Sequence, residues 1–143
     1  MFKGSFYIVY PVIKQLVVAF GEGQGDRLGV GSSSNSLPKA CYKTKNLKAK
    51  RVLSSYWHTV IVDSDDRLWR CGQIKRSSGN ASEYELVDTI KEKVKLVTVG
   101  KFNIMVVTED NKIYRQGFSK EGHLGLNTDY QQMTRFEKVN DEE

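Results

Sequence analysis

Two histidines are the first residues to test for chemistry, because histidine is the commonest general base near neutral pH. His58 follows Trp57 within an apolar run, and neither a Ser or Cys nucleophile nor a supporting acid is identifiable around it. We therefore expect His58 to be a buried ring that bonds to the backbone. His123 falls in a glycine turn, where we expect it to be solvated. No catalytic set emerges, and the chain is not expected to be an enzyme.

A glycine-rich run from Gly21 to Gly31 has the composition of a phosphate-binding loop, since glycine lets backbone N–H groups approach a phosphate. The spacing does not fit a nucleotide site. Asp26 stands where the dinucleotide pattern needs its next glycine, and no Gly-Lys-Ser/Thr triplet follows. We therefore interpret the run as structural turns.

Cys41 and Cys71 are the only cysteines, and they form no Cys-x-x-Cys pair. Since the two histidines lie far apart in the sequence, a zinc cluster is not expected, and neither is any other cofactor. Two cysteines are too few for a disulfide framework, although they allow one bridge, and this favours a reducing interior. We expect an intracellular protein, in the nucleus or the cytoplasm.

Basic side chains recur at equivalent points of the chain and could contact an anionic partner. Such alternation beside edge strands discourages edge pairing, yet charges stacked on one side of adjacent repeats also suit a nucleic acid backbone or an acidic protein surface. The formal net charge of +5 permits such a partner without requiring one. The residues concerned are Lys43, Lys45, Lys48, Lys50 and Arg51, then Lys75 and Arg76, then Lys91, Lys93 and Lys95.

An internal repeat positions these residues. The segment 55–72 aligns without a gap with the segment 100–117, and four positions are identical: Val62 with Val107, Asp65 with Asp110, Arg70 with Arg115 and Gly72 with Gly117. Each copy predicts a β-hairpin, with a run of apolar and β-branched residues, a turn of Asp and Asn residues, and a second short strand that ends at glycine.

A more degenerate third copy occupies residues 4–21, with its turn at Lys14-Gln15. This copy makes the apolar N-terminus a strand pair rather than a targeting segment, and its polar interruptions make it unsuitable for spanning a bilayer. Leu28-Gly29 and Leu124-Gly125 follow the first and third copies at the same offset. The 143 residues are enough for one domain, 1–143, built of repeats at approximately 4–54, 55–99 and 100–143.

The repeat resembles that of the regulator of chromosome condensation family. The likeness is carried by Phe20-Gly21 at a strand end, a loop from Gly25 to Gly31 that closes on Leu-Gly-x-Gly, Pro38, and His58-Thr59 before an apolar run. The resemblance implies an all-β fold, a partial β-propeller of about three four-stranded antiparallel blades, whereas the family usually closes a ring of about seven. It also implies structural roles in the repeat for Gly21, Leu28, Gly29, His58, Gly72, Gly100, Gly117, Leu124 and Gly125.

Three blades form an open arc with two bare edges, and exposed strand edges promote aggregation. We therefore expect a non-enzymatic protein-interaction or scaffold module that a partner chain or a second copy completes. The alternative, implied by the founding member of the family, is a guanine-nucleotide-exchange factor for a Ran-like small GTPase. Nucleic acid binding through the basic residues is a third hypothesis, and no membrane contact is expected.

Overall fold

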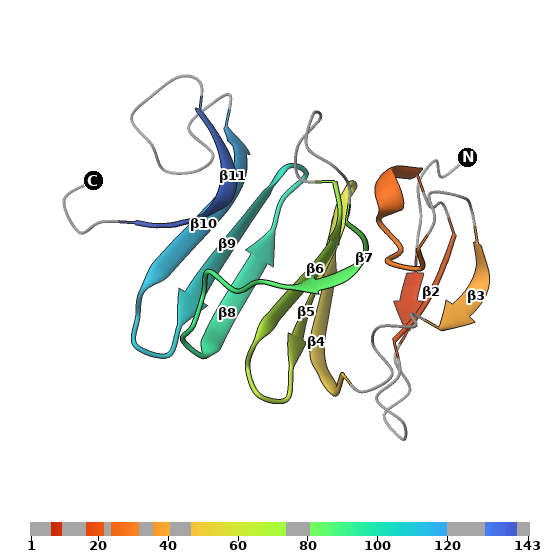
Figure 1. Cartoon of the computed structure of the whole chain (residues 1–143), viewed down its shortest axis with the longest axis horizontal. Coiled ribbons are helices and arrows are strands. Elements are labelled where there is room, and N and C mark those ends of the chain that lie inside the picture. Colours follow the sequence, from red (N-terminus) through yellow and green to blue (C-terminus); the bar gives the residue numbers. More distant parts are fainter. Residues whose placement is uncertain are drawn as a thin grey trace.

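The computed structural model describes residues 7–9, 17–21, 24–31, 36–40, 47–73, 81–119 and 131–139. These residues form antiparallel β-sheets and one short 3-10 turn, η1 (Gln24–Asp26), which confirms the predicted all-β class. The three sheets lie side by side in chain order, from β1–β3 at the right of Figure 1 to β8–β11 at the left. No helix in this part of the chain is long and apolar enough to cross a membrane.

Two of the sheets have four strands each, and consecutive strands are neighbours. One contains β4 (Ala49–Ser54), β5 (His58–Asp63), β6 (Leu68–Gly72) and β7 (Ala81–Leu86), and the other contains β8 (Val94–Val99), β9 (Asn103–Thr108), β10 (Ile113–Ser119) and β11 (Gln131–Lys138). Before them come β1 (Tyr7–Val9), β2 (Val18–Gly21) and β3 (Ser36–Ala40). The pairing of β1 with β2 forms the strand pair expected at the N-terminus, and the turn predicted at Lys14-Gln15 lies outside the described residues.

The repeat is visible in individual hydrogen bonds, at a constant offset of 45 residues between the second and third copies. The Ser55 N–H donates to the His58 carbonyl at 2.8 Å and closes the turn between β4 and β5. The Gly100 N–H donates to the Asn103 carbonyl at 2.8 Å and closes the turn between β8 and β9. Different side chains therefore support the same backbone path.

A glycine is the last residue of β2 and of β6 and lies two residues before the end of β10, where the strand pairing is irregular. Gly21, Gly72 and Gly117 each lie at an irregularity of the strand pairing, with φ of 109°, 90° and 130°. A Cβ on Gly72 would collide with the carbonyl oxygen of Trp57, and a Cβ on Gly117 with that of Phe102. The positive φ and the missing space both exclude other residues.

Apolar side chains fill the spaces between the sheets. Along β5, Val60 and Val62 point into the core shared with β8–β11, whereas Ile61 points into the core shared with the first sheet. Alternate residues of a strand face opposite sides of a sheet, so β5 is buried on both faces. The sheet β4–β7 is therefore the middle layer of the three.

Each four-stranded sheet begins one strand before the repeat boundary placed on the sequence. The boundaries at 55 and 100 fall in the turns between β4 and β5 and between β8 and β9. Both β4 and β8 start with an irregularity of register, and Lys50 and Lys95 occupy the same position in them. Each four-stranded sheet therefore consists of the last strand of one sequence repeat and the first three strands of the next.

Candidate interaction surfaces

The Leu-Gly loop after the first hairpin is wedged between two sheets. Leu28 is fully buried in the core that joins the first sheet to the middle sheet. Gly29 has a φ of 65°, and a Cβ there would lie 2.9 Å from the Cys71 Sγ and closer still to the Tyr84 ring. This loop therefore fixes one sheet against the next. Its counterparts in the third repeat, Leu124-Gly125, lie outside the described residues.

His58 is fully buried at the start of β5, and its Nδ1 lies 3.1 Å from the Ser55 Oγ. Burial and, to a smaller extent, the charge of Arg70 lower the pKa of His58 to about 4, although a hydrogen bond to the Asn103 backbone acts in the opposite direction. The ring is therefore neutral at neutral pH. It is closed off from substrates, so it can support the turn but offers no surface charge.

The basic residues of β4 and β8 lie beside the turns that follow β5 and β9. Lys50 forms an ion pair with Asp66 at 2.6 Å, and Lys95 donates to the Asn111 Oδ1 at 3.3 Å in the equivalent position. The hydrogen bond from Lys50, with the nearby charge of Lys93, holds the pKa of Asp66 below its usual range. The positive charge at this end of the sheets is therefore partly compensated.

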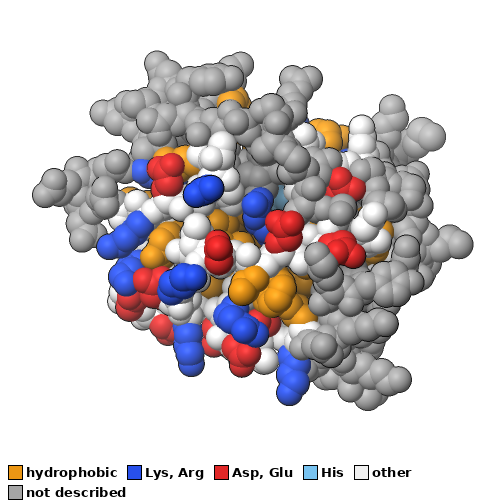
Figure 2. All heavy atoms as spheres, in the orientation of Figure 1, with side chains coloured by type: hydrophobic (Ala, Val, Ile, Leu, Met, Phe, Trp, Pro, Cys, Tyr) orange, Lys and Arg blue, Asp and Glu red, His pale blue; other side chains and the backbone are white. Residues whose placement is uncertain are grey.

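Acidic and basic side chains alternate over this end of the molecule. Figure 2 shows them intermingled along the lower edge of the viewed face, where Figure 1 places the turns after β5 and β9. Lys48, Lys91 and Lys93 are exposed there. Their contact with an anionic partner stays a prediction. Four of the predicted basic positions lie outside the described residues: Lys43, Lys45, Lys75 and Arg76.

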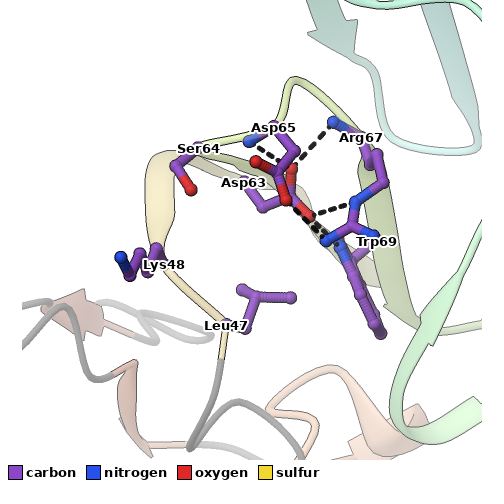
Figure 3. A pocket seen from close by; sticks show the side chains of 7 residues that line it. All are labelled: Leu47, Lys48, Asp63, Ser64, Asp65, Arg67 and Trp69. Carbon is purple, nitrogen blue, oxygen red and sulfur yellow. Dashed lines mark hydrogen bonds and ion pairs between the residues drawn. The ribbon is translucent and has the colours of Figure 1, made fainter.

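Beside the turn after β5 is a half-open cavity of about 400 Å³, with Leu47 and Trp69 among its lining residues. In Figure 3, Asp63 lies between Asp65, Arg67 and Trp69. One Asp63 oxygen accepts the N–H groups of Asp65 and Arg67 at 3.0 and 2.9 Å. The other accepts the Arg67 Nε–H and the Trp69 indole N–H, both at 2.9 Å. The buried carboxylate is committed to shaping the turn.

The third repeat builds the same turn from a different set of side chains. Thr108 replaces the buried aspartate, and its Oγ1 accepts the Lys112 N–H at 3.0 Å. The Lys112 ammonium bridges Glu92 at 2.5 Å and Asp110 at 2.9 Å, and its pKa is raised by these contacts. Tyr114 donates to Glu92 at 3.1 Å where Trp69 donates to Asp63 in the second repeat. The sequence alignment of the two repeats matches these turn positions, but it does not show which hydrogen bonds and ion pairs their side chains make.

Aromatic side chains form a row at the opposite end of the two sheets, at the turns before β5 and β9. Trp57 stacks on Phe102 across the sheets, with ring centroids 6.3 Å apart. Tyr56 has the guanidinium of Arg27 at 5.1 Å and the ammonium of Lys101 at 5.4 Å from its ring centroid. The aligned aromatics at 57 and 102 are the signal in the sequence from which this row could have been found.

The last sheet carries three apolar side chains on the face that points away from the other sheets. Leu96 pairs with Val107, and Val107 pairs with Ile113, so the three lie side by side across β8, β9 and β10. Leu96 is 56% exposed and Ile113 is 37% exposed. Their neighbours in sequence face the core between the sheets. We refer to Leu96, Val107 and Ile113 as the apolar row.

The equivalent positions on the middle sheet are covered. There Arg51 pairs with Val62, and Val62 pairs with Leu68. Val62 and Leu68 are buried against the sheet β8–β11. Arg51 donates to two carbonyl groups of β8, those of Lys95 at 2.8 Å and Val94 at 3.2 Å. Within the described part of the chain, no sheet covers the apolar row in the same way.

Known proteins share this arrangement. No family model matches the chain. The ultraviolet-B receptor UVR8 of Arabidopsis thaliana is 25% identical over 130 residues, which are 85% of this chain and 30% of the receptor. Human WBSCR16 has a TM-score of 0.75 at 16% identity, over 97% of this chain and 39% of that protein. Yeast RCC1 (Prp20) bound to Kap60 has a TM-score of 0.74 at 17% identity, over 92% of this chain and 35% of that protein.

The fold resembles that of yeast RCC1, a regulator of chromosome condensation. A second structure of Prp20p, from Saccharomyces cerevisiae, studied with its binding to Gsp1p and histones, has a TM-score of 0.75 at 18% identity over 88% of this chain and 34% of that protein. The fold is thus β-propeller-like, with the repeats stacked as layers. The chain spans about a third of the length of the proteins it matches.

Proposed function

We propose that the chain is a protein-interaction module of about three propeller blades, whose last sheet is covered by a second copy or by a partner chain. One observation carries the proposal. The positions that the middle sheet buries against its neighbour, Val62 and Leu68, correspond on the last sheet to Val107 and Ile113 of the partly exposed apolar row. Apolar side chains that are buried in one repeat and exposed in the next mark a surface that is built to be covered.

Light scattering of the purified chain over a range of concentrations tests the second-copy form of this proposal. We expect a dimer or larger particle that Leu96→Lys converts to a monomer, because a charge in the row opposes burial. Leu86→Lys is the matched control, since Leu86 is 44% exposed on a different sheet. Equal masses for the wild type and the Leu96 variant at every concentration would contradict self-association through the apolar row.

A second candidate function is guanine-nucleotide exchange on a Ran-like small GTPase. It is favoured by the fold shared with Prp20p, a protein whose structure is described together with its binding to Gsp1p and histones. The chain covers about a third of that protein, so fewer loops are available to press on a nucleotide site. A nucleotide-release assay on a panel of labelled GTPases separates the candidates, because an interaction module leaves the spontaneous release rate unchanged.

A further inference from the structure

A second cavity lies between the middle and last sheets, away from the apolar row. It has a volume of about 510 Å³ and is lined by residues of β6, β7, β10 and β11. Its most buried lining residues include Gln116 and Phe136, with the half-buried Arg70 beside them. Glu85 and Arg135 are exposed lining residues at its rim. The cavity therefore combines a polar interior with a mixed-charge mouth.

Gln116 supplies a buried hydrogen-bond acceptor that has no partner among the residues that the structure describes. Its Nε2 donates to the Thr134 carbonyl at 2.7 Å, which fixes the orientation of the amide because only the nitrogen can donate. The Oε1 is then left without a hydrogen bond, on a residue that is only 2% exposed. A buried acceptor of this kind is expected to find a donor, so a ligand N–H group fits it.

Arg70 supplies a half-buried cation in the same cavity. Within the described residues its side chain makes no hydrogen bond or ion pair, and burial lowers its pKa while the charge of Glu85 on β7 opposes that shift. Guanidinium groups bind carboxylates through paired N–H bonds, and partial burial strengthens such bonds. The interior of the cavity thus presents one strong donor group and one acceptor.

We propose that this cavity binds a carboxylate group of a peptide, with Arg70 holding the carboxylate and Gln116 Oε1 accepting a neighbouring peptide N–H. The exposed carboxylates of Glu85 and Asp88 at the mouth favour a ligand whose acidic group is followed by a cationic side chain. Because the site is formed by two adjacent sheets of one chain, it does not depend on how the apolar row is covered.

The test is a titration of the full chain with short peptides, followed by the NMR signals of the Arg70 Nε–H and the Gln116 side-chain amide. The first probe, acetyl-Ala-Glu-Lys-Ala-amide, has only a side-chain carboxylate. The second, acetyl-Ala-Gln-Lys-Ala with a free C-terminus, has only a terminal one, and the third, acetyl-Ala-Gln-Lys-Ala-amide, has none. We expect one of the first two to shift both signals and the third to shift neither. Equal shifts with all three, or shifts with none, would overturn the proposal.

Variants test the roles of the two side chains. Arg70→Gln is expected to weaken binding of the responding peptide by about tenfold or more, and Gln116→Leu by about fivefold. Lys93→Gln is the matched control, because it removes an exposed positive charge that does not line the cavity. Unchanged affinity in both cavity variants would contradict the assignment. If Arg70→Gln does not fold, the three peptides on the wild-type chain and the Gln116 variant still decide it.

Discussion

At the scale of single residues, space and backbone conformation decide which positions must be glycine. Gly72 has a φ of 90°, and a Cβ there would meet the Trp57 carbonyl oxygen and lie 2.8 Å from the His58 Cα. Gly31 has a similar φ of 80°, but the nearest atoms to its Cβ position are those of the Glu83 side chain at 3.7 Å. Comparing substitutions at these two glycines therefore separates the cost of a strained backbone from the cost of a steric clash.

Gly72→Ala is expected to destabilise the chain by about 2 kcal/mol more than Gly31→Ala. Both variants strain the backbone, but only the first also drives a methyl group into the neighbouring strand. Chemical denaturation followed by fluorescence measures the difference in the free energy of unfolding. Equal losses would mean that the strand moves away without cost and that the close approach is not what selects glycine.

His58 makes stability depend on pH. Its pKa is about 4 in the folded chain, against an ordinary value of 6.5, so the unfolded chain takes up a proton first as the pH falls. The contribution of the neutral His58 ring to the free energy of unfolding is complete above pH 6.5. It is lost progressively as the pH falls towards 4, by about 3 kcal/mol in total. Asn103, at the same position of the next repeat, shows that a side chain without this titration fits the turn.

His58→Asn is therefore expected to flatten the dependence of the free energy of unfolding on pH between 6.5 and 4, because one proton fewer is taken up on unfolding. Denaturant titrations at half-unit pH steps on the wild type and the variant measure it. Carboxylates titrate in both proteins, so the difference between the two curves reports His58. Parallel curves would show that the folded ring is protonated as easily as the unfolded one.

At the scale of elements, the turn between the two strands of each hairpin shows how two different sets of side chains support one backbone shape. Asp63 joins two backbone N–H groups to the side chains of Arg67 and Trp69, whereas Thr108 uses a hydroxyl and leaves the charges to Lys112 and its partners. A buried carboxylate that satisfies four donors is costly to replace. An exposed ion pair at the same turn contributes little.

Asp63→Asn is expected to cost about 2 kcal/mol or more, since the new amide hydrogens face donors on Arg67 and Trp69. Asp65→Asn is the matched control, because the exposed Asp65 side chain contacts, among the described residues, only the Arg67 guanidinium, at 3.0 Å. Its cost should stay within about 0.5 kcal/mol. Thermal unfolding of the two variants measures the difference, and equal effects would show that burial of the carboxylate does not decide its contribution to stability.

The sequence predicts the hairpins well because their signals are local. Apolar alternation, an Asp-Asn turn and a closing glycine all lie within one segment, such as 100–117. The contacts between sheets are not local, so alignment does not reveal them. Gly29 packs against Tyr84 and Cys71, which belong to another repeat. The cavity around Arg70 is lined by residues of both four-stranded sheets. The sequence therefore identifies the Leu28-Gly29 loop as a repeated turn but does not show that it packs between two sheets.

At the scale of the whole molecule, the layers differ in how many of their faces are covered. The middle sheet contributes Ile61 to one core and Val60 to the other, whereas the last sheet contributes Ile104 and Val106 to a single core and leaves the apolar row partly exposed. Each additional buried face adds hydrophobic stabilisation of a layer. The layers of a repeat protein therefore open with different free energies.

Hydrogen exchange on the dilute chain is expected to show β5 as more protected than β9, although both are inner strands of four-stranded sheets. Covering the apolar row, by a second copy at high concentration or by a partner chain, should raise the protection of β9 while leaving β5 nearly unchanged. Leu96→Lys should abolish that rise, and Leu86→Lys should preserve it. Equal protection of β5 and β9 in the dilute monomer would show that the last sheet needs no cover, and would contradict both forms of the proposed interaction.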